Sequence, residues 1–164
     1  MRPLTEPELR RSLTNSTRGE ANAMTLPKGF GDFDWAELEM LGWRDPKIPQ
    51  RGYVVGWDGD APVGLLLKAA ESKMSQRRAA MCFLCRCVVT ADNVSLFTAR
   101  RPGAAGRNGN TVGTYICADL ACSANLRAEL QPTRAMPDPS AAIAQRGTEL
   151  TARLSAFIDD VLRP

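Results

Sequence analysis

Four cysteines in this chain are spaced as ligands for a single metal ion. Cys82 and Cys85 form a C-x2-C pair, Cys117 and Cys122 form a C-x4-C pair, and thirty-one residues separate the two pairs. Four thiolates complete a tetrahedral shell around Zn²⁺ without an open coordination position, which is how structural zinc sites are built. The spacing therefore predicts one structural zinc ion bound by these four residues.

A fifth cysteine, Cys87, leaves an alternative ligand set, because Cys82 and Cys87 form a C-x4-C pair of their own. We favour Cys85, since the two-residue spacing is the commoner zinc knuckle. Cys87 is then expected to be a small apolar strand residue. A redox role for the Cys82–Cys85 motif is a further alternative, but such motifs belong to a βαβ context that this sequence lacks.

The chain contains no histidine, which excludes Ser-His-Asp and Cys-His catalytic sites. A catalytic zinc ion also needs an open position and usually a histidine or carboxylate ligand. No two of the carboxylates available near the turns and cysteines are spaced for acid–base work; they belong to Asp58, Asp60, Asp92 and Asp119. We therefore expect a protein that is not an enzyme.

Length and composition indicate a globular protein. A chain of 164 residues with 44% hydrophobic residues can form one ordinary domain or two small units that share a core. No run approaches the roughly 20 apolar residues that cross a bilayer, and residues 1–6 lack the apolar segment of a signal peptide. We therefore expect a cytoplasmic location, where thiols stay reduced and grouped cysteines bind metals.

Positive charge is concentrated around the cysteines. Residues 73–134 carry nine Lys or Arg against three Asp or Glu, whereas the rest of the chain has a small acidic excess. Three of these arginines, Arg100, Arg101 and Arg107, lie in the glycine-rich segment 100–110, which we expect to be a loop. A cationic segment attracts acidic proteins or RNA phosphates, although the same charges can simply keep a surface solvated. We take the three arginines as candidate partner-binding residues.

The N-terminal part of the chain contains two helix-start signals. Residues 5–8 match a capping box, in which the first and fourth residues satisfy each other's hydrogen bonds, and predict a helix to about Asn15. Residues 16–31 are expected to break this helix and to be irregular. Residues 34–37 match a second capping box, and predict a short helix that ends at Gly42 in a left-handed cap.

The clearest strand signal precedes the cysteines. Residues 52–57 and 63–67 are rich in strand-forming residues, and the Asp-Gly-Asp sequence of residues 58–60 predicts the turn of a β-hairpin between them. Residues 68–80 are polar and basic, and are expected to form a connecting helix or loop.

The residues around the cysteine pairs predict a treble clef. Strands are expected at 87–90, 94–98 and 111–116, and a helix capped by Asp119 is expected from Leu120 to about Leu130. This places Cys117 at a strand end and Cys122 in the first helical turn, where the helix N-terminus favours a thiolate. A knuckle, a hairpin and a helix that carries the last ligand follow one another in the order of a treble-clef zinc finger.

The C-terminal part predicts a proline-rich linker over residues 132–139 and an amphipathic helix over residues 140–164. The apolar stripe of this helix consists of Ile143, Leu150, Leu154, Phe157, Ile158 and Val161. We expect this stripe to pack on the body of the protein rather than on a partner. The predicted fold class is α+β, with a helix and β-hairpin unit over residues 1–80 joined to a zinc-stabilised finger over residues 81–131.

Several stretches resemble the FBP-type C-terminal treble-clef zinc-finger family. In the finger they are residues 81–86 (MCFLCR), 100–103 (RRPG) and 109–123 (GNTVGTYICADLACS); before it, residues 15–21 (NSTRGEA) and 41–46 (LGWRDP) are similar to its actinobacterial branch. The resemblance covers roughly residues 5–130. By position, it implies zinc ligands at Cys82, Cys85, Cys117 and Cys122.

The resemblance also implies a cytoplasmic binding protein. The family includes elongation factor G-binding proteins, proteins described as fibronectin-binding, and FusB-type fusidic-acid resistance proteins. FusB-type members bind elongation factor G through the zinc finger and help to release it from ribosomes stalled with the antibiotic. We therefore expect elongation factor G or the ribosome as the partner. FusB-type members have a longer helical N-terminal domain than residues 1–80 of this chain.

The alternative is direct binding of RNA or another nucleic acid by the basic finger. The aromatic residues near its basic side chains are Phe83, Phe97 and Tyr115. We expect two of the three to be buried, which would leave few platforms for base stacking.

Overall fold

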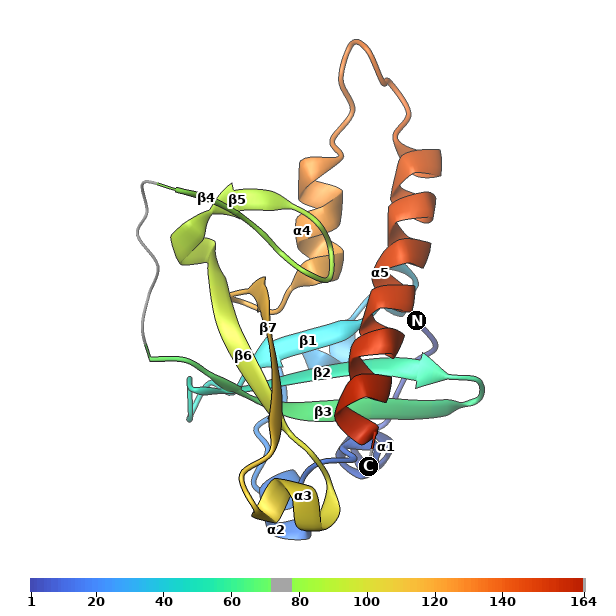
Figure 1. Cartoon of the computed structure of the whole chain (residues 1–164). Helices are drawn as coiled ribbons and strands as arrows, with labels where there is room; N and C mark the ends of the chain where they lie inside the picture. The colour runs from blue at the N-terminus through green and yellow to red at the C-terminus, as the bar shows by residue number, and fades with distance from the viewer. Residues whose placement is uncertain (72–77, 164) are drawn as a thin grey trace.

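A five-stranded antiparallel sheet is the centre of the fold in the computed structural model, which describes residues 1–71 and 78–163 (Figure 1). Its order is β1 (Leu41–Arg44), β2 (Arg51–Asp58), β3 (Ala61–Ala69), β6 (Val94–Arg100) and β7 (Thr111–Cys117). A second sheet pairs β4 (Ala79–Met81) with β5 (Val88–Thr90). The helices are α1 (Glu6–Ser12), α2 (Arg18–Asn22), α3 (Gly103–Arg107), α4 (Cys122–Glu129) and α5 (Ser140–Leu162). This arrangement confirms the α+β class.

The capping box at Thr5 and Glu8 forms as predicted and starts α1, although the helix ends at Ser12 rather than near Asn15. The expectation of irregular structure after it was wrong for Arg18–Asn22, which form α2. Thr17 and Glu20 make a capping box of their own: the Thr17 N–H donates to the Glu20 carboxylate, and the Glu20 N–H donates to the Thr17 hydroxyl. This capping box was not predicted from the sequence.

The predicted helix from residue 34 to Gly42 was wrong. Trp35–Glu37 form only a 3₁₀ turn, in which the Asp34 carboxylate accepts from the Ala36 N–H, and the chain then enters strand β1. Gly42 lies inside this strand, where an added Cβ would be 2.3 Å from the carbonyl oxygen of Leu120. The glycine therefore permits a close approach between two segments and does not cap a helix.

The predicted hairpin is confirmed. β2 pairs with β3 along its length, and the tight turn between Asp58 and Ala61 uses Gly59 in the left-handed region at φ 54°. β3 continues to Ala69, so the polar segment after the hairpin begins later than expected. Residues 72–77 of that segment lie outside the described residues.

The two faces of the sheet bury different cores. On one face, Val54 and Leu65 pack in a cluster with the Leu150 and Leu154 side chains of α5. On the other, Tyr53 and Val55 pack with residues of α1. The apolar stripe of α5 is thus buried in cis: Leu150, Leu154, Phe157, Ile158 and Val161 all belong to the first cluster. The five-stranded sheet combines β1, β2 and β3, from the predicted unit over residues 1–80, with β6 and β7, from the predicted finger over residues 81–131.

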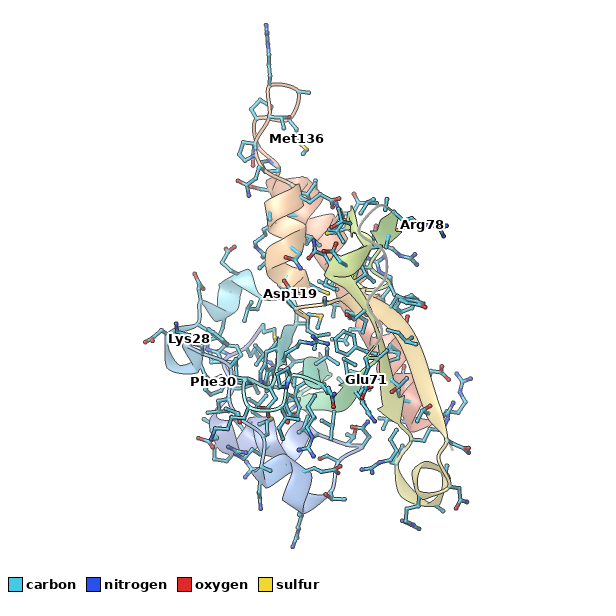
Figure 2. The ribbon with its side chains drawn as sticks, turned by 90° about the vertical axis from the view of Figure 1, so that its left-hand side faces the viewer. Lys28, Phe30, Glu71, Arg78, Asp119 and Met136 are labelled. Carbon is cyan, nitrogen blue, oxygen red and sulfur yellow. The ribbon has the colours of Figure 1, made fainter. Side chains whose placement is uncertain are left out.

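The connection between α4 and α5 projects from the body of the molecule. Figure 2 shows Met136 at its far end, and Figure 1 shows α4 and α5 side by side below it. In the described part of the chain, no helix combines the length and apolarity needed to cross a membrane.

Candidate metal centre

The four predicted ligands come from two turns that face each other. Cys82 and Cys85 lie in the turn between β4 and β5, which is closed by a hydrogen bond from the Arg86 N–H to the Cys82 carbonyl at 3.1 Å. Cys117 is the last residue of β7, and Cys122 is the first of α4. The Phe83 N–H donates to the Tyr115 carbonyl at 2.8 Å and joins the first turn to β7.

The sulfur positions fit a zinc ion. All four Sγ atoms lie within 4.8 Å of one another, and the Cys82–Cys122 and Cys85–Cys117 pairs are 3.7 and 3.5 Å apart. Zinc–sulfur bonds of about 2.3 Å in a tetrahedron place the sulfurs about 3.8 Å apart. Four thiolates would close the tetrahedral shell without an open position, and all four side chains are buried. The site is therefore suited to one structural Zn²⁺.

Two non-glycine residues adopt left-handed backbone to form these turns. Arg86 has φ 61° and Leu120 has φ 62°, a conformation that costs about 1–2 kcal/mol for a residue with a Cβ. Surrounding contacts hold them in place: the Arg86 guanidinium lies 5.5 Å from the Phe83 ring centroid, and the Leu120 side chain is fully buried. The strained turns therefore depend on packing as well as on the metal.

The four cysteine sulfurs lie within hydrogen-bond distance of one another in pairs. Hydrogen bonds from Cys117 and Cys122 lower the pKa of Cys82. The same contacts with Cys117 and Cys82, together with burial, raise the pKa of Cys122. The backbone N–H of Cys117 also donates to the Cys82 sulfur at 3.4 Å. Because zinc binds thiolates, the ion would displace the protons that these sulfurs share.

Cys87 lies outside the sulfur cluster, which agrees with the preference for Cys85 as ligand. Its sulfur is 3.5 Å from the Arg146 guanidinium of α5, which also donates to the Cys85 carbonyl at 2.9 Å and pairs with Glu129 at 2.6 Å. The hydrogen bond with Cys85, and then burial, raise the pKa of Cys87. Cys87 is thus a buried thiol that packs beside the knuckle.

The ligand helix begins two residues later than predicted. α4 starts at Cys122, while the Asp119 carboxylate accepts from the Ala121 N–H at 2.9 Å and from the Asn125 amide at 3.1 Å. Asp119 therefore stabilises the start of the helix from outside it. Cys122 lies at the N-terminus of α4, where backbone N–H groups favour a negative sulfur.

The segment 100–110 is not the open loop that the sequence predicted, because it contains helix α3. Gly106 makes this compact shape possible, since an added Cβ would be 1.8 Å from the Arg101 carbonyl oxygen. Arg100 pairs with Glu20 at 2.9 Å, and Arg101 donates to the carbonyl oxygens of Asp160 and Arg163 at 2.5 and 2.6 Å. Two of the three predicted contact arginines are therefore held within the chain, while Arg107 is exposed.

The finger exposes apolar side chains that sequence analysis missed. Met81, Val88 and Tyr115 are 50, 59 and 48% exposed, although each lies in a strand. The expectation that two of three nearby aromatic residues are buried was wrong, because only Phe97 is buried while Phe83 is half-buried. Strand alternation carried the relevant signal: Met81 and Val88 are register partners, so both point to one face.

Comparison with known proteins extends the geometric evidence. The family described as FBP C-terminal treble-clef zinc-finger matches residues 8–161. A solved structure titled "Structure of the fusidic acid resistance protein FusC" is similar with a TM-score of 0.51 and 20% sequence identity, over 85% of this chain and 51% of that chain. This chain thus spans about half the length of that structure, and the likeness concerns the fold. No curated protein sequence matches the chain.

Proposed function

This chain belongs to the FBP C-terminal treble-clef zinc-finger family, and from that premise we propose that it is a cytoplasmic protein that binds a translation factor, elongation factor G, or the ribosome. A FusB-like role in antibiotic resistance is part of the proposal, and the fold shared with the fusidic acid resistance protein FusC supports it. The role is one of binding rather than catalysis, because four cysteines close the metal shell.

The observation that carries the proposal is an exposed apolar patch on the finger, which we call the finger surface. It consists of Met81, Phe83, Arg86, Val88 and Tyr115. Met81 and Val88 face each other across β4 and β5, and the Arg86 guanidinium lies 4.0 Å from the Met81 sulfur and over the Phe83 ring. Backbone hydrogen bonding places Phe83 beside Tyr115. Large exposed side chains gathered on one unit are typical of a protein-binding site.

The charge around the finger surface favours an acidic partner. Arg86 lies within it, and Arg78, which precedes β4, is exposed and lies at the same end of the molecule (Figure 2). Aromatic, methionine and arginine side chains are enriched at protein interfaces. Arg107 stays a candidate contact because it is exposed, whereas the intramolecular hydrogen bonds of Arg100 and Arg101 suit them to holding the segment 100–110 in shape.

The proposed test is capture of purified elongation factor G by the zinc-loaded protein. The double variant Met81→Ser/Val88→Ser is expected to weaken binding at least tenfold, since central interface anchors often contribute more than 1–2 kcal/mol. Ile48→Ser is the matched control, because Ile48 is 38% exposed but lies between β1 and β2. Absence of a complex at low salt, or an equal loss in both variants, would contradict the proposed partner and surface.

Binding of ribosomal RNA is a second candidate function, and the exposure of Tyr115 favours it. An exposed aromatic ring on a basic finger can stack a base while neighbouring arginines contact the phosphates. Binding of RNA would weaken steeply with salt, because phosphate contacts release counterions. The same variants assayed with a ribosomal RNA fragment at low and raised salt distinguish it from an apolar protein contact. Resistance itself is measured as growth in fusidic acid with and without expression of the chain.

A further inference from the structure

A cleft of about 480 Å³ lies on the sheet face opposite α5. Its floor comes from β2, β3 and β6, and its walls include Glu20 of α2 and the glycines Gly106 and Gly109. This volume is within the range of about 300–1,000 Å³ that is typical of small-molecule sites. Figure 1 shows α2 and α3 at one end of β6 and the β4–β5 hairpin at the other, so the cleft is remote from the finger surface.

One row of side chains crosses the floor of the cleft. Arg51 of β2 is the register partner of Lys68 of β3, Lys68 is the partner of Thr98 of β6, and Thr98 is the partner of Gly113 of β7. Register partners lie on the same face of an antiparallel sheet, with Cβ atoms about 4.5–5.5 Å apart. The row therefore presents two cations and a hydroxyl group next to one another.

The pairing of Arg51 with Lys68 is unfavourable in the isolated protein. Like charges directly opposite each other destabilise an antiparallel strand pair. Within the described residues, neither side chain forms a salt bridge, and residues 72–77 contain no carboxylate in their sequence. Arg51 interacts instead with the neutral hydroxyl of Tyr53. The Tyr53 hydroxyl in turn donates to the buried Asp45 carboxylate, so a carboxylate lies one hydrogen bond away from Arg51. Neither Arg51 nor Lys68 makes a direct ion pair within the described residues.

The carboxylate that lines the cleft does not neutralise this pair. Glu20 is the acidic residue among the described lining residues, and it is 2.9 Å from the Arg100 guanidinium. Its carboxylate also accepts from the Thr17 N–H at 2.7 Å as part of the α2 capping box. Glu20 therefore pairs with Arg100, and the cationic groups of Arg51 and Lys68 stay free of a direct ion pair that a ligand would have to displace.

We propose that the cleft binds a small phosphorylated molecule, with its phosphate held by Arg51 and Lys68. A phosphate carries up to two negative charges and several acceptor oxygens, so it can take charge-assisted hydrogen bonds from both cations and from Thr98. A bound phosphate would also relieve the repulsion between the two strands. No aromatic side chain lines the cleft in the described part of the chain, so it lacks the stacking platform typical of single-stranded RNA sites.

The test is a titration of the zinc-loaded, full-length protein with inorganic phosphate and pyrophosphate, followed by ¹H–¹⁵N NMR at constant ionic strength. Saturable shifts are expected at the amides of Lys68, Thr98 and Gly109, with none at Cys85. Lys68→Met should weaken binding about tenfold, the effect of one lost charge-assisted contact. Arg134→Met, which removes the same charge from the exposed linker, should leave binding unchanged.

The unfolding temperature separates this role from a structural one. Because Lys68→Met removes a like-charge pair, its unfolding temperature should equal or exceed that of the parent protein; Arg51→Gln is a second variant with the same expected loss of phosphate binding. Equal weakening by Lys68→Met and Arg134→Met would overturn the proposal. So would shifts spread over all basic residues, or binding of an RNA oligonucleotide in the absence of any phosphate or pyrophosphate binding.

Discussion

The guanidinium of Arg146 on α5 donates a 2.9 Å hydrogen bond to the carbonyl oxygen of Cys85, a predicted zinc ligand. Two turns further along the same helix, Arg153 donates to the Leu84 carbonyl oxygen at 2.6 Å. Side chains of the C-terminal helix therefore hydrogen-bond to backbone carbonyl groups of the first knuckle, although the two segments are far apart in the sequence. We therefore expect zinc affinity to depend on the docking of α5.

Replacing Arg146 with methionine should weaken zinc binding about tenfold, because groups that support metal ligands typically contribute 10- to 100-fold to affinity. The change also leaves Glu129, its partner at 2.6 Å, without this ion pair. Competition with a chromophoric chelator measures the affinity. Arg134→Met is the matched control on the exposed linker. Equal zinc affinity in both variants would show that α5 does not support the knuckle.

Cys85→Ala and Cys87→Ala should differ sharply in zinc content. The sulfur of Cys85 lies in the four-cysteine cluster and that of Cys87 does not. Cys87→Ala should keep one zinc ion per chain and lose only the stabilisation of a small buried side chain, about 1 kcal/mol. Cys85→Ala should lose the ion and, with it, most of the folding free energy of the finger. Elemental analysis of the purified variants decides between them, and zinc loss in Cys87→Ala would favour the alternative ligand set.

The sequence predicted which four thiols gather in one cluster, because spacing alone limits which thiols can reach one ion. It also predicted the β2–β3 hairpin, whose turn and strands are adjacent in the chain. It did not predict strand β1, because Trp35, Leu38 and Leu41 are spaced as an apolar helical stripe. The chain instead enters a strand in which Gly42 lies against Leu120. A contact between segments so far apart in the sequence cannot be read from a local pattern.

The roles of the arginines in the segment 100–110 also depend on residues far away in the sequence. Arg101 was predicted to contact a partner protein, but its guanidinium donates to the carbonyl oxygens of Asp160 and Arg163 at the end of α5. Arg101→Ala should therefore lower the free energy of unfolding by about 1–3 kcal/mol, as for lost hydrogen bonds to a charged group. Arg107→Ala, at an exposed position, should change it by less than about 0.5 kcal/mol. Urea unfolding measures both, and equal stabilities would contradict this division of roles.

The buried pair Asp45 and Tyr53 should shape the pH dependence of stability. Asp45 is 1% exposed and accepts from the Tyr53 hydroxyl and the N–H groups of Thr25, Lys47 and Ile48. Although burial alone would raise the pKa of Asp45, these hydrogen bonds lower it overall. The contribution of ionised Asp45 to the stability of the fold is thus fully present above the ordinary carboxyl pKa of about 4. It is lost as pH falls through the lower pKa of the folded state.

The tyrosine acts at the opposite end of the pH range. Burial, and then the Asp45 charge, raise the pKa of Tyr53 from 10.0 to about 12. Its contribution is present below about pH 10 and is lost as pH rises toward 12. Tyr53→Phe should flatten this alkaline decline in stability. Asp45→Asn should lower the free energy of unfolding by about 2–4 kcal/mol at neutral pH, because the amide would turn N–H groups toward backbone donors. Chemical unfolding at a series of pH values tests both; an unchanged alkaline slope in Tyr53→Phe would contradict the assignment.

Gly42→Ala should connect the N-terminal strand to the metal site. The new methyl group would lie 2.3 Å from the Leu120 carbonyl oxygen, and Leu120 occupies the left-handed position between the ligands Cys117 and Cys122. Because backbone must move to make room, we expect a loss of about 1–3 kcal/mol, as for overpacking in a core, together with weaker zinc binding. Gly31→Ala is the control, since nothing lies within 4 Å of its added Cβ. If Gly42→Ala lowered stability but left zinc affinity at the parent value, the strand and the second knuckle would be energetically independent despite their contact.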